Sequence, residues 1–170
     1  NNAFQSSSID SVNFSGCDSL ISIGDYAFDG NDLTELDLSA CSNLRIIGEQ
    51  SFRSNAITGI DLSGCNKLEI IKRYAFSSNS LNSIDFSGCQ TLGYIGEYAF
   101  YGLSSFELPA VTGYEEYGWR DASNNSHASG ATVTNVTIWY KAAIPYTLTD
   151  DDVVVTDGQI VSCSYNFALH

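Results

Sequence analysis

The chain has 170 residues, 44% of them hydrophobic and 16% charged, with a formal net charge of −13. This composition allows one domain with a small appendage and argues against a disordered chain. No apolar run is close to the roughly 18 residues that a membrane span needs, and the excess of acid excludes nucleic acid as an expected partner. Because the chain starts at Asn1 and contains no Met, we expect it to be a fragment or a processed product.

A period of 24 residues runs through the first part of the sequence. Several independent columns share it: Phe4, Phe28, Phe52, Phe76 and Phe100; Cys17, Cys41, Cys65 and Cys89; Leu20, Leu44, Leu68 and Leu92; Ile23, Ile47, Ile71 and Ile95. A repeat of this length is typical of a solenoid, in which each coil buries its apolar face only against its neighbours.

Within one unit the apolar positions follow the leucine-rich pattern L-x-x-L-x-L-x-x-C-x-x-L, as in Leu33 to Leu44. The L-x-L core predicts a short strand, and successive strands about 4.8 Å apart should form a parallel sheet on the concave face. A second extended piece follows at residues 20–23. The turn at residues 24–28 is then expected to form one helical turn or a 3-10 segment, with its Phe filling the core from the opposite side.

The phrase I-G-x-Y-A-F at Ile23–Phe28 and Ile95–Phe100, followed by G-C-x-x-L, resembles the BspA-like leucine-rich repeat family. The resemblance covers about residues 1–108. It implies a solenoid from a bacterial surface or secreted protein that adheres to host proteins or to other cells. One departure is that Ser-Gly-Cys or Ser-Ala-Cys follows the concave strand, where the family often has Pro. Only the last strand, which ends at Leu108-Pro109, keeps that Pro.

The pattern changes after residue 108. The fifth strand arrives two residues early and Pro109 is expected to end the ladder. Residues 109–143, with Gly118-Trp119 and Trp139-Tyr140, resemble part of a bacterial surface-protein B-repeat, which implies a small β module used as a spacer or stalk. In residues 144–170, Asp157-Gly158 between two β-rich runs predicts a hairpin extension. We therefore expect a solenoid at 1–108, a β module at 109–143 and a hairpin at 144–170.

The four cysteines at a spacing of 24 occupy one column that faces the core. Stacked side chains with parallel Cβ directions are poorly arranged for disulfides, so we favour reduced, buried thiols over two disulfides. Zinc is less favoured still, because its ligands must converge. Cys163 has no evident partner. No cofactor is predicted from these residues.

A column of mainly acidic side chains lies at the middle position of the concave strands, beside a column of serines. We call these residues the concave strip: Asn13, Asp37, Asp61, Asp85 and Glu107, with Ser15, Ser39, Ser63 and Ser87. Carboxylates about 5 Å apart in water repel by under about 1 kcal/mol per pair, so the column needs no bound cation. It is either a solvated face that discourages sideways strand pairing or a ligand site for a protein or calcium.

Catalysis has little support, because the sequence lacks a Ser/His/Asp grouping, a metalloprotease motif and a phosphate-binding glycine loop. We expect a non-enzymatic, extracellular or cell-surface module that binds a protein ligand through the concave strip, such as a host or neighbouring-cell surface protein. Two alternatives remain open. One is a carbohydrate-binding or cell-wall-binding module with Trp119 and Trp139 as an aromatic platform, although a small β module also needs aromatics for its core. The other is a purely architectural spacer.

Overall fold

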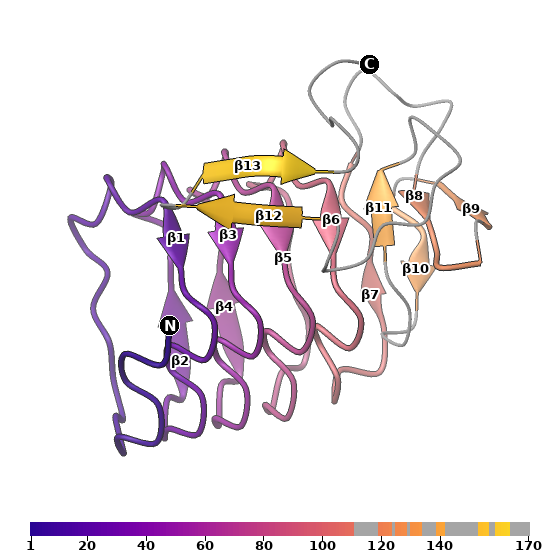
Figure 1. Cartoon of the computed structure of the whole chain (residues 1–170). Helices are drawn as coiled ribbons and strands as arrows, with labels where there is room; N and C mark the ends of the chain where they lie inside the picture. The colour runs from indigo at the N-terminus through magenta and orange to yellow at the C-terminus, as the bar shows by residue number, and fades with distance from the viewer. Residues whose placement is uncertain are drawn as a thin grey trace.

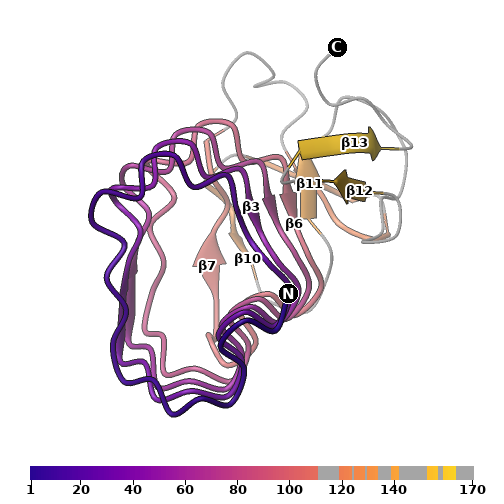
Figure 2. The ribbon, with the colours of Figure 1, turned by 60° about the vertical axis from the view of Figure 1, so that its left-hand side comes forward.

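The computed structural model describes residues 1–110, 119–123, 125–128, 130–133, 139–141, 153–156 and 159–163. These residues form short strands and turns and contain no helix, so the fold is mainly β with parallel strands, as predicted. The coils stack side by side along one axis (Figure 1) and superimpose when seen nearly along that axis (Figure 2). Each coil therefore rests on its neighbours, as a solenoid requires.

The longest sheet lies on the isoleucine side of the solenoid. Its parallel part, the isoleucine sheet, consists of β1 (Ser22–Ile23), β3 (Ile46–Ile47), β5 (Ile70–Ile71) and β6 (Tyr94–Ile95). Paired residues are 24 positions apart in the sequence, as in Ile23 with Ile47 and Ile47 with Ile71. The sheet continues with antiparallel β11 (Trp139–Lys141), β8 (Trp119–Arg120) and β9 (Ser126–His127).

The L-x-L side is less continuous than predicted. Here β2 (Glu35–Asp37) pairs in parallel with β4 (Gly59–Asp61), and β7 (Phe106–Glu107) pairs antiparallel with β10 (Thr132–Val133). Residues 83–85 of the fourth unit form no strand. The expected parallel sheet through all L-x-L segments is therefore wrong, because β7 arrives two residues early and takes an antiparallel partner instead.

Two strands lie in the C-terminal region where a hairpin extension is predicted. Strands β12 (Val153–Thr156) and β13 (Gln159–Cys163) pair antiparallel, with an irregular register between Val154 and Val155. The side chains of these strands lie outside the described residues, as do residues 157 and 158, where the turn is predicted.

A stack of phenylalanine rings forms the centre of the core, as predicted. The rings of Phe28, Phe52, Phe76 and Phe100 follow one another at 5.3–5.4 Å between centroids and within 3° of parallel. The last three are at most 1% exposed. Burial of this size is the main source of stability in each coil.

The turn that carries each Phe is not helical, and the expected 3-10 segment is wrong. The residue two positions before the Phe has a left-handed backbone, with φ between +52° and +57°, at Tyr26, Gln50, Tyr74 and Tyr98. A left-handed residue ends a right-handed helical turn at once. Instead, alternate N–H groups of the turn donate to the next coil, as in Phe28 to the Ser51 carbonyl at 2.7 Å.

Strands after residue 118 pair with the last solenoid strand on each side. β11 pairs with β6, and β10 pairs with β7. The Trp119 side chain is fully buried, and its Nε1 donates to the Pro109 carbonyl at 2.9 Å. These contacts cover strand edges that would otherwise pair with other chains.

Candidate ligand-binding surface

The acidic side chains of the concave strip are fixed by a short turn. In three successive coils, Oδ1 of Asp37, Asp61 and Asp85 accepts the N–H of Ser39, Ser63 and Ser87, each at 2.8 Å. Asn13 makes the same bond to Ser15 at 2.8 Å. Hydrogen bonds from the side chain and backbone of Ser39 lower the pKa of Asp37. The turn therefore holds each carboxylate in a fixed position, and at Asp37 it also favours the charged form.

The concave strip is exposed and flat. Asp37, Asp61 and Asp85 are exposed, and Asp37 lies opposite Asp61 in the β2–β4 ladder. The serine beside each of them is too small to cover it. Glu107 is exposed as well, but it pairs with Thr132 and does not continue the ladder. The structure thus brings most of the predicted strip together and sets Glu107 apart.

The L-x-L segments of the described coils are free of basic residues. Residues 1–18, 30–42, 54–66, 78–90 and 103–110 contain no Lys or Arg, although they contain eight acidic residues. Four basic side chains elsewhere join coils through ion pairs. Arg45 with Glu69, Arg53 with Asp29 and Arg73 with Glu97 join neighbouring coils, and Lys72 with Asp25 spans the coil between them. Those positive charges are neutralised away from the strip, which keeps its negative field.

The cysteine column is reduced and structural. Cys17, Cys41, Cys65 and Cys89 are free, as predicted, and the last three are buried. The Cys65 thiol donates to the Leu38 carbonyl at 3.3 Å. Burial raises the pKa of Cys65 and Cys89 to about 12. Among the described residues, no group of three or more His, Cys, Asp or Glu side chains is arranged to hold a metal ion.

The aromatic platform proposed for Trp119 is wrong. The side chain is 0% exposed, because it packs into the end of the solenoid core, and its one polar atom bonds to Pro109. Such a ring cannot stack on a ligand in solution. The backbone of Trp139 lies in β11, and its side chain lies outside the described residues.

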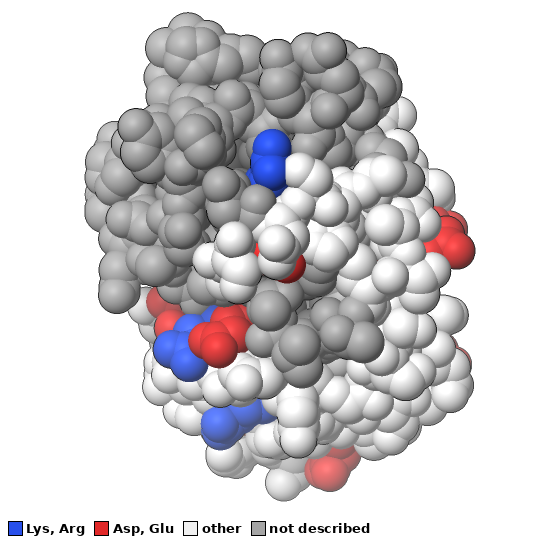
Figure 3. Space-filling model, turned by 90° about the vertical axis from the view of Figure 1, so that its right-hand side faces the viewer, with Lys and Arg blue, Asp and Glu red and all other residues white. Residues whose placement is uncertain are grey.

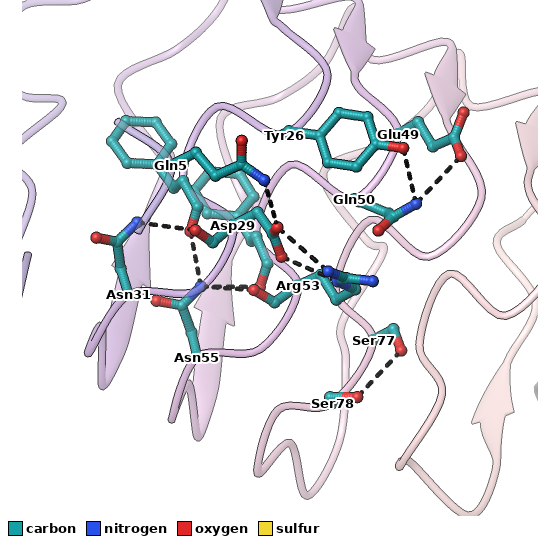
Figure 4. A network of polar contacts seen from close by, with 12 residues as sticks. Gln5, Tyr26, Asp29, Asn31, Glu49, Gln50, Arg53, Asn55, Ser77 and Ser78 are labelled. Carbon is teal, nitrogen blue, oxygen red and sulfur yellow. Dashed lines mark hydrogen bonds and ion pairs between the residues drawn. The ribbon is translucent and has the colours of Figure 1, made fainter. Parts of the chain in front are cut away.

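Sequence reasoning missed a second column, formed by Asn31, Asn55 and Asn79. Nδ2 of Asn55 donates to the carbonyls of Phe28 and Phe52, at 2.9 and 3.1 Å, while its Oδ1 accepts the Leu33 N–H at 3.1 Å. Asn79 repeats this arrangement one coil later. Figure 4 shows Asn31 and Asn55 beside the Asp29–Arg53 ion pair. The spacing of 24 residues between these asparagines could have revealed the column from the sequence. The role of the column is structural.

A shallow groove of about 520 Å³ crosses four coils on the side of the isoleucine sheet. It is lined by Ser19, Ile21, Asn43, Arg45, Lys67, Glu69 and Thr91. Arg45 and Glu69 bond to each other at 2.8–3.0 Å, and Lys67 donates to Asn43 at 2.7 Å. Because these groups are already paired between coils, the groove is less suited to a ligand than the concave strip.

The comparisons agree with this architecture. Residues 1–117 match the family model of the BspA type leucine rich repeat region, in six copies. The chain therefore belongs to the BspA-type leucine-rich repeat family. No curated protein and no solved structure matches significantly, and nothing among the comparisons supports the B-repeat resemblance of residues 109–143. Within the described residues, no helix is long and apolar enough to span a membrane.

Proposed function

We propose that this chain is a non-enzymatic, protein-binding module of a surface or secreted protein, and that its ligand site is the concave strip. Leucine-rich repeats of this family generally mediate contacts between proteins, which supports the class of function. The observation that carries the site is the row of outward-held carboxylates in described coil segments that contain no Lys or Arg.

The expected ligand is a protein with a basic surface. Each carboxylate uses Oδ1 for its own turn, which leaves Oδ2 for a partner's Arg or Lys. The net charge of −13 speeds the approach of such a partner at low salt. An adhesive role toward a host or neighbouring-cell protein follows from the family's usual setting. Calcium remains an alternative occupant of the strip.

The test is binding of the whole chain to an array of matrix proteins and glycans, with and without calcium. The matched variant is Asp37→Asn/Asp61→Asn/Asp85→Asn, because Asn13 shows that Asn forms the same turn bond. We expect protein binding that the variant loses. Glycan binding that the variant keeps would refute the proposed site, and no binding at all would favour an architectural spacer.

A further inference from the structure

The groove on the side of the isoleucine sheet lies between two columns of the repeat. Residues 19, 43, 67 and 91 form one column, and residues 21, 45 and 69 form the other. Adjacent coils are joined beside it by the parallel pairs β1–β3, β3–β5 and β5–β6, so its wall is part of the ordered solenoid. Its volume of about 520 Å³ is in the range of sites for small molecules.

Lys67 is the unusual residue of this groove. Five basic side chains belong to the described coils, and four of them form ion pairs with Asp or Glu. Figure 3 shows this common arrangement on one face of the molecule, where a group of basic atoms lies directly against acidic atoms. Lys67 is the fifth, and its Nζ donates to the neutral Oδ1 of Asn43 at 2.7 Å. Within the described residues, its charge is therefore not compensated by a carboxylate.

Glu69 lies two residues from Lys67, but Arg45 engages its carboxylate. Nε of Arg45 donates to Oε1 at 3.0 Å, and Nη2 donates to both oxygens at 2.8 and 2.9 Å. This fork neutralises Glu69. Asn43 fixes the Lys67 ammonium, which keeps two further N–H groups for a ligand. With Arg45 and Lys67 against Glu69, the groove carries one net positive charge in a chain of net charge −13.

An apolar side chain lines the groove beside this charge. Ile21 is 37% exposed, and it begins the column that continues with Arg45 and Glu69. Lys67 is exposed as well, two coils further along. A ligand that matches both features carries one negative charge and a short apolar chain. A multiply charged anion is less suitable, because the field of the whole chain is negative.

We propose that this groove binds small organic carboxylates that carry a short apolar chain. The carboxylate accepts hydrogen bonds from the Lys67 ammonium, and the apolar chain lies against Ile21. Two coil spacings of about 4.8 Å separate the backbones of these residues, and a hexanoate ion can reach across them. The site is separate from the concave strip, takes a ligand of the opposite charge and goes beyond the proposed function.

The test is a titration of the intact chain with hexanoate at neutral pH and about 150 mM salt, followed by NMR of the amide groups. Hexanamide is the neutral analogue, and acetate lacks the apolar chain. We expect hexanoate to shift the signals of Asn43, Lys67 and Ile21. It should bind at least about fivefold more tightly than either of the other two probes, because only hexanoate supplies both the charge and the apolar chain.

Three variants assign the binding to the groove, after circular dichroism shows that they fold like the wild type. Lys67→Gln removes the charge and should weaken hexanoate by about fivefold or more. Lys72→Gln is the matched control, because its ammonium pairs with Asp25 outside the groove, and it should leave the affinity unchanged. Ile21→Ser should weaken hexanoate by about threefold and leave acetate unchanged.

Several results would overturn the proposal. Hexanoate would leave the signals of the groove residues unchanged, or would shift those of other residues instead. Equal binding of hexanoate by Lys67→Gln and wild type would remove the assigned contact. Equal binding of hexanamide and hexanoate would show that the charge plays no part. Equal binding of acetate and hexanoate would reduce the site to a general anion contact and contradict the assigned class of ligand.

Discussion

Asn55 shows how one side chain fixes the contact between neighbouring coils. Its amide donates to the carbonyls of Phe28, Phe52 and Arg53 and accepts the N–H of Leu33. Backbone groups this close to a dry core have no adequate substitute partner if the amide is removed. The asparagine column therefore joins the turns of neighbouring coils by hydrogen bonds, as the sheets join their strands.

Asn55→Ala should lower the free energy of unfolding by about 2–4 kcal/mol, because several partly buried backbone groups lose their partner together. The measurement is urea unfolding followed by circular dichroism. Asn43→Ala is the matched control, since Asn43 bonds at an exposed site and its loss should cost under about 1 kcal/mol. Equal costs for the two variants would contradict the role assigned to the column.

The buried thiols give the fold a sensitivity to alkali. Burial raises the pKa of Cys65 and Cys89 from 9.0 to about 12, so between these values the folded chain holds protons that the unfolded chain has released. Their contribution to stability is complete below pH 9 and is lost as the pH rises toward 12. Compared with wild type, Cys65→Ala/Cys89→Ala should show a shallower fall of the free energy of unfolding in this window. Equal slopes in pH-dependent unfolding would refute this assignment.

At the scale of the element, the turns at Gly64 and Gly88 depend on close backbone approach. A Cβ at Gly88 would lie 2.4 Å from the Ser63 carbonyl oxygen and 2.6 Å from that of Leu62. Both atoms belong to the preceding coil's backbone, which cannot move without shifting that coil. This contact accounts for Gly at position 88, while the second coil holds Ala40 at the equivalent position.

Gly88→Ala should therefore destabilise the chain by about 1–3 kcal/mol through overpacking. Gly59→Ala is the matched control in β4, where an added Cβ meets nothing within 4 Å. It should change the free energy of unfolding by less than about 0.5 kcal/mol or raise it slightly. Thermal and urea unfolding of both variants decide the matter. If Gly88→Ala left the free energy of unfolding unchanged, the coils would stack less tightly than the structure shows.

The elements also show what the sequence could and could not predict. The Phe, Ile and Leu columns predicted the stacked core, because a strict spacing brings like residues together. The spacing did not reveal that Asp37 would bond to Ser39, nor that Tyr26 would adopt a left-handed backbone in place of a helical turn. Those features depend on how one coil's backbone meets the next. Similarly, Trp119 could be read as a surface ring because nothing local marks its burial under Pro109.

At the scale of the whole molecule, antiparallel strands pair with the last solenoid strand on each side, β11 with β6 and β10 with β7. Trp119→Ala would empty a fully buried site and remove the donor to Pro109, and should cost about 3–5 kcal/mol. Exposing the sheet edges should also cause association. Denaturant unfolding and light scattering after gel filtration measure these two effects. A monomer of unchanged stability would show that the closing strands are dispensable.

The paired basic side chains and the unpaired acidic side chains lie on different sides of the coils. Ion pairs between coils neutralise four basic side chains, while the concave strip carries acid without compensation. This separation matters more to recognition than the net charge, because it concentrates the field on one side. It is also the reason that the strip, rather than the groove at Arg45 and Glu69, is the proposed ligand site.

The most direct test is the affinity for a protein ligand found on the array, measured as a function of salt. Wild type would be compared with Asp37→Asn/Asp61→Asn/Asp85→Asn, after circular dichroism shows that both fold alike. The account predicts that wild-type affinity falls as salt rises from about 50 to 300 mM, and that the variant binds at least about tenfold more weakly with little salt dependence. Equal affinity and equal salt dependence in the two proteins would contradict the concave strip as the ligand site.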